Sequence, residues 1–179
     1  ILIEDNEDKI SYEIIKKNTD KAFKLSNLNI NSEINLSKLT YKNNFESIQK
    51  YFPEVKELIN FKNHKIKINY DKDKTKIIGS GKILIEDNED KISYEIIKKN
   101  NQYYFKKAFE VEQNILINEL QYHKEKNKKA LIKIEGILTV NKNLFFNEIS
   151  LIENNNSILL KNLNLNNKFK IYDIGVLEF

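Results

Sequence analysis

Residues 64–70 read HKIKINY, an alternation of polar and apolar side chains that indicates the secondary structure of this segment. Ile66, Ile68 and Tyr70 occupy every second position, with lysine or asparagine between them. Successive side chains of a β-strand point to opposite faces of the sheet. The pattern therefore predicts a strand with one apolar and one polar face.

The same alternation recurs along most of the chain, in residues 28–36 and 131–140 and more briefly elsewhere. Turn-like polar stretches separate the predicted strands at residues 71–74, 86–91, 124–129, 141–143 and 153–157. Short spacings between turns are typical of antiparallel meanders. The sequence predicts a mainly β protein whose consecutive antiparallel strands form a curved, groove-like or solenoid-like sheet.

One segment, at about residues 45–60, departs from this alternation. Its apolar residues follow a helical spacing, with Pro53 among them: Phe45, Ile48, Phe52, Val55 and Ile59. Proline separates helical turns or opens a new one. We therefore predict a short helical excursion that covers an edge or an end of the sheet.

An eighteen-residue sequence, ILIEDNEDKISYEIIKKN, occurs twice without change, at residues 1–18 and 83–100. It arose either by recent duplication in a natural array or by assembly of a sequence that reused a segment. Both origins suit an architecture that grows by adding strands. The chain has no methionine and opens on Ile1. We expect residues 1–179 to form a single β-rich segment of a longer, repeat-like protein.

The composition argues against several classes of function. All 30 basic residues are lysine and are interleaved with 26 acidic residues, so no basic stretch of the kind that binds nucleic acid stands out. With no cysteine, disulfides and thiolate sites are excluded. No apolar run reaches the roughly 20 residues that span a bilayer. Abundant lysine, asparagine and isoleucine are typical of an AT-rich bacterial genome.

Candidate chemical groups are scattered along the sequence. His64 and His123 have no partners at metal-ligand spacing, which favours strand-end or turn positions. Residues 86–91, EDNEDK, lack the glycine of a calcium loop and are interpreted as a solvated hairpin turn. Gly79 and Gly81 precede a strand instead of a helix, so they indicate a bulge or close packing. We predict no catalytic group, cofactor or metal, and hence no enzyme.

The apolar face of the predicted sheet requires a cover. Three arrangements satisfy it: closure into a barrel or sandwich, a structural or adhesive β-solenoid with a packed core, or an open sheet whose trough binds lipid acyl chains. The sequence offers little helix to act as a second layer, and these alternatives remain open at this point.

Four segments resemble the strand–turn–strand pattern of the AsmA-like superfamily, which includes TamB-like and YhdP-like proteins: residues 61–70, 77–83, 130–136 and 161–165. They show an I-x-I strand, a polar turn, an I-x-G-x-G motif and an N-L-x-L motif, and the resemblance spans residues 25–179. It implies a long curved sheet with a hydrophobic trough that conducts phospholipid between the inner and outer membranes of the bacterial envelope, without catalytic residues.

The resemblance also implies partners and a location. We expect phospholipid acyl chains and neighbouring β units of the same longer chain as partners, no nucleic acid, and a periplasmic segment anchored to the inner membrane from outside residues 1–179. The structural or adhesive β-repeat remains the alternative function. The lipid-facing candidates are Ile66, Ile68, Tyr70, Ile83, Ile85, Ile132, Ile134, Leu138, Val140, Leu163 and Leu165.

Overall fold

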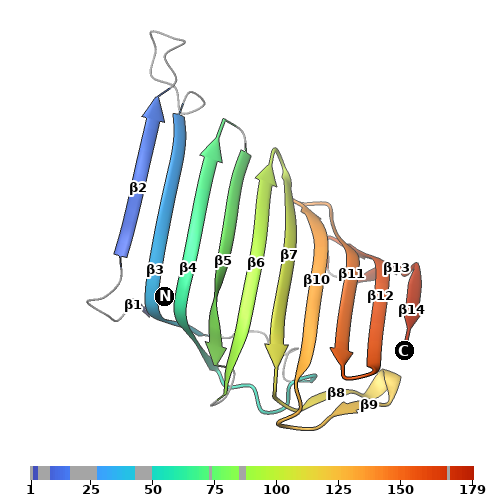
Figure 1. Cartoon of the computed structure of the whole chain (residues 1–179). Helices are drawn as coiled ribbons and strands as arrows, with labels where there is room; N and C mark the ends of the chain where they lie inside the picture. Colours follow the sequence, from blue (N-terminus) through green and yellow to red (C-terminus); the bar gives the residue numbers. More distant parts are fainter. Residues whose placement is uncertain are drawn as a thin grey trace.

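The computed structural model describes residues 2–3, 9–16, 28–42, 50–72, 74–84, 88–168 and 170–179. They form one large antiparallel sheet of 12 strands and a separate two-stranded hairpin (Figure 1). Consecutive strands are neighbours along most of the sheet, so the chain runs as a meander. In the described residues β2 lies at one end of the sheet and β13 and β14 at the other, which leaves it open. The predicted fold class is confirmed.

The strands of the large sheet are β1 (Leu2–Ile3), β2 (Lys9–Lys16), β3 (Leu28–Lys42), β4 (Leu58–Asp71), β5 (Lys74–Leu84), β6 (Glu89–Lys99), β7 (Gln102–Val111), β10 (Ala130–Thr139), β11 (Asn143–Glu153), β12 (Asn156–Asn166), β13 (Ile171–Asp173) and β14 (Val176–Glu178). The small hairpin consists of β8 (Ile115–Ile117), a 3-10 turn (Asn118–Leu120) and β9 (Tyr122–Lys124).

Asparagine residues make several of the tight turns between strands. Asn100, Asn141 and Asn154 have φ angles of 53°, 61° and 52° at the turns β6–β7, β10–β11 and β11–β12. Asparagine tolerates this left-handed conformation better than most side chains because it hydrogen-bonds locally. Asparagine, which is abundant in this sequence, therefore favours the tight turns that connect the strands of the meander.

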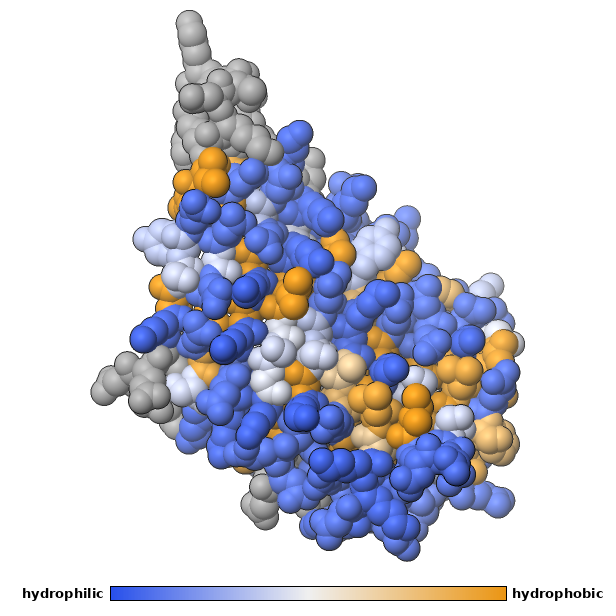
Figure 2. Space-filling model, viewed as in Figure 1, coloured by the Kyte–Doolittle hydropathy of each residue, from blue (hydrophilic) through white to orange (hydrophobic). Residues whose placement is uncertain are grey.

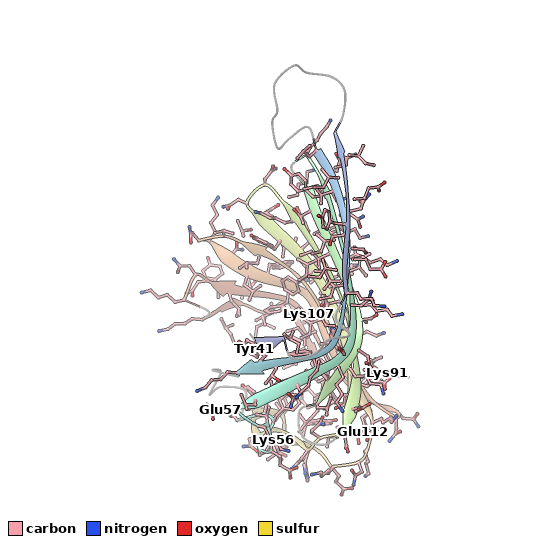
Figure 3. The ribbon with its side chains drawn as sticks, turned by 90° about the vertical axis from the view of Figure 1, so that its left-hand side faces the viewer. Tyr41, Lys56, Glu57, Lys91, Lys107 and Glu112 are labelled. Carbon is pink, nitrogen blue, oxygen red and sulfur yellow. The ribbon has the colours of Figure 1, made fainter. Side chains whose placement is uncertain are left out.

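The sheet has a concave and a convex face, and Figure 3 shows its bend. Tyr41 and Lys107 lie on the concave side, and Lys91 lies on the other side. Paired residues of neighbouring strands share a face, and successive residues alternate, so the strand register assigns each strand side chain to one face. In-strand isoleucines such as Ile66 and Ile68 share the concave face with Lys107.

The convex face is largely hydrophilic (Figure 2). Cross-strand ion pairs cover it, including Lys67–Glu33 at 3.6 Å, Lys76–Glu95 at 3.2 Å and Lys106–Glu135 at 3.0 Å. An apolar row interrupts it toward β10–β12, where Ile97, Tyr104, Ile137 and Phe145 are paired in register. The predicted polar face is present, with this row as an exception.

Glycines let large side chains lie flat on the concave face. A Cβ atom at Gly79 would lie 2.2 Å from the Tyr94 ring, and one at Gly81 would lie 2.4 Å from the His64 ring. No real Cβ atom approaches that closely, so both positions require glycine unless the rings move. The prediction that these glycines mark close packing is confirmed.

The predicted helix at residues 45–60 is wrong where the structure describes it. Residues 50–57 form turns, and β4 begins at Leu58; residues 45–49 lie outside the described part. The Val55 N–H donates to the Phe52 carbonyl at 3.1 Å, which closes a turn at Pro53. Phe52 and Val55 nevertheless pack on the sheet, so the helical spacing marked apolar contacts instead of a helix.

Two polar sites also differ from the sequence-based expectation. Asp90, expected in a solvated turn, lies in β6 and is 3% exposed. His64, expected at a strand end or turn, is buried within β4. In both cases long-range packing covers a residue whose sequence neighbours are polar. Among the described residues, no helix is long and apolar enough to cross a membrane.

Candidate functional site

At one end of the concave face, the side chains of neighbouring strands form three rows that run across the sheet. The first row is Ile34, Ile66, Gly79, Tyr94, Lys107, Ile134, Ile149 and Leu160. The second is Ser32, Ile68, Ile77, Ile96, Phe105, Gly136, Phe146 and Leu163. The third is Ile30, Tyr70, Thr75, Lys98, Tyr103, Leu138, Leu144 and Leu165. We call these three rows the open end.

The other end of the concave face is covered by protein, and we call it the capped end. The cap consists of residues 50–57 and the β8–β9 hairpin, joined by a hydrogen bond from the Leu116 N–H to the Tyr51 carbonyl at 3.0 Å. Two buried clusters lie where the cap packs on the sheet, and each includes residues of both. The first comprises Val111, Ile115, Ala130, Ile132 and Leu151, and the second Val55 and Ile83. The capped end is an ordinary hydrophobic core.

A buried polar group fastens the hairpin to the sheet. Lys124 of β9 is fully buried, and its Nζ atom donates to the carbonyls of Gln113 and Glu125. Burial lowers the pKa of Lys124, and the charges of Glu153 and Asp90 oppose that shift. A buried ammonium group without such partners would be strongly disfavoured. The two hydrogen bonds link the segments that flank the hairpin, and the charges of Glu153 and Asp90 link Lys124 electrostatically to the sheet.

A second polar contact supports the same anchor. The Tyr122 hydroxyl of β9 donates to Oε2 of Glu153 on β11 at 2.8 Å. Burial is the main cause that raises the pKa of Tyr122, and the Glu153 carboxylate adds to it. Burial also raises the pKa of Asp90. The cap thus meets the sheet through both apolar and charged side chains.

His64 and Tyr94 mark the boundary between the two ends. Their rings are stacked with centroids 6.3 Å apart, and Phe61 meets His64 edge-on at 5.2 Å. His64 is 4% exposed, and burial lowers its pKa. Burial thus disfavours the charged imidazolium, and the ring is part of an aromatic layer across β4–β6.

The side chains of the open end are mostly half-buried. Ile66, Ile68, Ile77 and Ile96 are all partly accessible to solvent, and none of them belongs to a buried cluster. Phe105 and Phe146 meet edge-on with centroids 5.9 Å apart. These side chains form a surface of aliphatic and aromatic groups, and Ile134 of the first row packs against the first buried cluster.

The charges of the open end are all positive. In β3–β12, its charged side chains are Lys98 and Lys107. Lys107 is exposed beside Tyr94 and Ile134, and it forms no ion pair with a described residue. The Nζ atom of Lys98 lies 5.8 Å from the centroid of the Tyr103 ring. An anionic group held over this face would meet cations and no carboxylate.

The sequence-predicted lipid-facing residues fall into three groups. The in-strand members all point to the concave face: Ile66, Ile68, Tyr70, Ile83, Ile132, Ile134, Leu138, Leu163 and Leu165. Ile83 and Ile132 lie beneath the cap, where protein side chains already cover them. Val140 lies in the turn after β10, and Ile85 lies outside the described residues.

Sequence reasoning missed the two lysines of the open end. Lys98 continues the alternation of Ile92, Tyr94 and Ile96, and Lys107 falls between Phe105 and Phe109. The sequence signal for both residues was a lysine at a position where the alternation calls for an apolar side chain. The cap could not be found in this way because it depends on contacts between residues distant in sequence.

Other surfaces of the described residues are weaker candidates for a binding site. A shallow depression of about 410 Å³ on the convex face lies over the small side chains Ser80, Ser93 and Ala108. Its rim carries the ion-paired side chains Lys106 and Glu135. In the described part of the chain no three histidine, aspartate or glutamate side chains are grouped to hold a metal ion.

No protein-family model, curated protein or solved structure matches this chain. The resemblance to AsmA-like proteins therefore remains a prediction from the residues quoted above.

Proposed function

We propose that the open end of the concave face binds the acyl chains of an anionic phospholipid, and that the chain is a non-catalytic segment of a lipid-conducting β-groove. The supporting observation is that three rows of mostly apolar side chains from β3–β12 lie side by side on the concave face, while the described cap covers the other end of that face. Binding and conduction require a continuous apolar path and no reactive group.

The driving force for acyl-chain binding is removal of apolar surface from water. Each Å² of apolar surface that is buried contributes roughly 25 cal/mol. The half-exposed rows at Ile66 and Ile68 leave such surface available, and a chain laid across the strands would cover it. No large conformational change is required, because the described cap leaves the open end free.

Lys98 and Lys107 suit an anionic headgroup. A lysine ammonium binds phosphate oxygens as a point charge, and the attraction strengthens when nearby apolar groups exclude water. Lys107 lies in the first row of the open end and Lys98 in the third, so a headgroup near either places its acyl chains over isoleucine and phenylalanine.

The proposal includes a location and partners. The ion-paired convex face suits contact with water, and an open sheet can continue into further strands. In the AsmA-like interpretation this is the periplasm, with neighbouring β units of a longer chain extending the groove and an anchor in the inner membrane. Phospholipid would then move along the groove between the two membranes.

The second candidate function is a structural or adhesive β-repeat with a packed core and no ligand. The capped end favours it, because Val111 of the sheet and Ile115 of the cap are 0% and 2% exposed where the two pack together. This candidate predicts that the open end is covered by protein in the working assembly instead of by lipid.

Native mass spectrometry of the purified chain, incubated with vesicles of phosphatidylglycerol, separates the two candidates. We expect one or more phospholipid molecules to remain bound. A chain that takes up no phospholipid under these conditions would overturn the proposal and favour the structural repeat.

A matched pair of variants locates the binding face. Ile96 and Ile97 are adjacent and half-buried in β6, but Ile96 faces Ile77 and Phe105 on the concave side and Ile97 faces Lys76 and Tyr104 on the convex side. Ile96→Asn should lose bound phospholipid, whereas Ile97→Asn should retain it. Equal loss of lipid in both, in parallel with loss of folded structure by circular dichroism, would indicate an ordinary core.

A further inference from the structure

The outer edge of β2 exposes apolar side chains. In the described residues β2 pairs with β3 alone, so its opposite edge has no partner strand. Ile10, Tyr12 and Ile14 point to the concave face and are 65%, 72% and 55% exposed. No proline interrupts β2, although proline is one of the residues that proteins use to block an exposed edge, and its lysines lie only at the two ends of the strand, Lys9 and Lys16.

The same sequence occurs in the middle of the sheet. Residues 83–100 repeat residues 1–18, so β6 carries Ile92, Tyr94 and Ile96 where β2 carries Ile10, Tyr12 and Ile14. In β6 these side chains are half-buried, and both edges are paired, one with β5 and the other with β7. The pairing of β6 therefore shows which kind of strand can bind each edge of this repeated sequence.

The strand order identifies which edge of β6 corresponds to the outer edge of β2. Four antiparallel pairings separate β2 from β6, so the two strands run in the same direction. Both direct their Ile-x-Tyr-x-Ile side chains to the concave face. The edge of β2 that meets β3 thus corresponds to the edge of β6 that meets β7. The outer edge of β2 corresponds to the edge that meets β5.

The side chains of β5 fit those of β6, with which it pairs. Gly79 lies opposite Tyr94, Gly81 opposite Ile92 and Ile77 opposite Ile96. The Tyr94 ring lies over Gly79 so closely that any Cβ atom there would overlap it. On the convex face, Lys76 of β5 forms an ion pair with Glu95, whose counterpart in β2 is Glu13.

We propose that the outer edge of β2 accepts an antiparallel strand of the β5 type. Such a strand has two glycines two residues apart, an isoleucine two residues before the first glycine, and lysines on the opposite face. The first glycine pairs with Tyr12, the second with Ile10 and the isoleucine with Ile14. Main-chain hydrogen bonds provide affinity, and the glycine beneath Tyr12 fixes the register.

This proposal is independent of lipid binding. It follows from the repeated sequence and from the β5–β6 pairing, and it holds whether or not the concave face binds a ligand. Its partner is a strand of another β unit that carries the I-x-G-x-G pattern.

Disulfide trapping tests the register directly, because the chain contains no cysteine. Ser80 of β5 lies opposite Ser93 of β6, and the counterpart of Ser93 in β2 is Ser11. The Ser11→Cys chain is mixed with a synthetic peptide of residues 74–84 in which Ser80 is replaced by cysteine. Directly opposite residues have Cβ atoms about 4.5–5.5 Å apart, which permits a disulfide after small adjustment.

We expect the disulfide to form at least tenfold faster with this peptide than with one whose cysteine replaces Thr75, which would lie out of register. Replacing Gly79 of the peptide by valine should slow the reaction by a similar factor. Equal rates for these peptides would overturn the proposal.

Two controls exclude other occupants. The Ser93→Cys chain should react slowly with the same peptide, because β5 already fills that edge; equally fast reaction there would mean that the peptide displaces β5, and would overturn the proposal. The Ser11→Cys chain alone should remain monomeric. A disulfide dimer that forms faster than the peptide adduct would assign the edge to a second copy of the chain and overturn it as well.

Discussion

The two ends of the concave face are made of similar side chains but differ in what covers them. At the capped end, Val111 of the sheet and Ile115 of the cap are 0% and 2% exposed, and the buried residues of both clusters lie at this end. At the open end, Ile68 and Ile96 lie on the same strands as capped residues yet stay half-exposed. One continuous surface therefore serves as core at one end and is half-exposed among the described residues at the other.

We therefore expect changes in stability and changes in ligand binding to be separable in this sheet. A core beneath the cap contributes the buried apolar area, while the strands extend beyond it and are held mainly by their backbone ladders and cross-strand pairs. Substitutions at the capped end should unfold the chain. Substitutions at the open end should change binding more than stability.

The largest loss of stability is expected from Lys124→Met. The change removes the buried ammonium group and leaves Glu153 and Asp90 without its opposing charge. Breaking a buried charge network by removing one partner costs about 3–5 kcal/mol. Urea unfolding followed by far-UV circular dichroism measures the change.

The matched control for Lys124→Met is Lys128→Met. Lys128 is an exposed residue, and it pairs with Glu125 at 2.9 Å. Surface ion pairs contribute less than about 1 kcal/mol, so this variant should unfold close to the parent chain. If both variants lose the same stability, the cap is not anchored through Lys124.

The next largest difference is expected between Ile115→Ala and Ile68→Ala. Ile115 is buried in the core beneath the cap, so its truncation leaves a cavity and should cost about 3 kcal/mol. Ile68 is half-exposed at the open end, and its truncation should cost about 1 kcal/mol. Urea unfolding gives both values. Similar losses at the two positions would mean that the open end is packed as tightly as the capped end.

The alternation in residues 64–70 was sufficient to place Ile66 and Ile68 on one face, because a strand has a period of two whatever its neighbours are. The same reasoning identified Gly79 and Gly81 as positions of close packing, which the rings of Tyr94 and His64 explain. These features depend on local geometry, and they could be predicted from the sequence.

The cap could not be predicted, because its residues are brought together only by the folded sheet. Lys124 begins a polar stretch, residues 124–129, that was interpreted as a turn, and yet it is fully buried. Residues 50–57 have a helical spacing of apolar residues but form turns that place Phe52 and Val55 on the core. Tertiary contacts decided both cases against the local pattern.

His64, at the boundary of the two ends, should make stability depend on pH. Burial lowers its pKa in the folded chain, so the unfolded chain binds the proton more readily. Its contribution is full above its unfolded pKa of about 6.5 and is lost as the pH falls below that value. We expect the free energy of unfolding to fall between pH 7.5 and pH 5.5.

The His64→Gln variant is the control, because glutamine does not titrate while the other groups remain common to both chains. Urea unfolding at several pH values should give a flatter profile for the variant. Coincident profiles for the parent and the variant would show that His64 is protonated as easily in the folded chain as in the unfolded one.

The smallest effect on stability, and the sharpest test of the open end, is expected from Lys107→Gln compared with Lys106→Gln. The two lysines are adjacent in β7, but Lys107 lies on the concave face without an ion pair to a described residue, and Lys106 lies on the convex face 3.0 Å from Glu135. Neither substitution should change the free energy of unfolding by more than about 0.5 kcal/mol, because both side chains are exposed.

Native mass spectrometry with phosphatidylglycerol and phosphatidylcholine vesicles should show that Lys107→Gln retains less of the anionic lipid and as much of the zwitterionic one. Lys106→Gln should retain both. If Lys107→Gln keeps its anionic lipid, the headgroup does not bind at the first row of the open end.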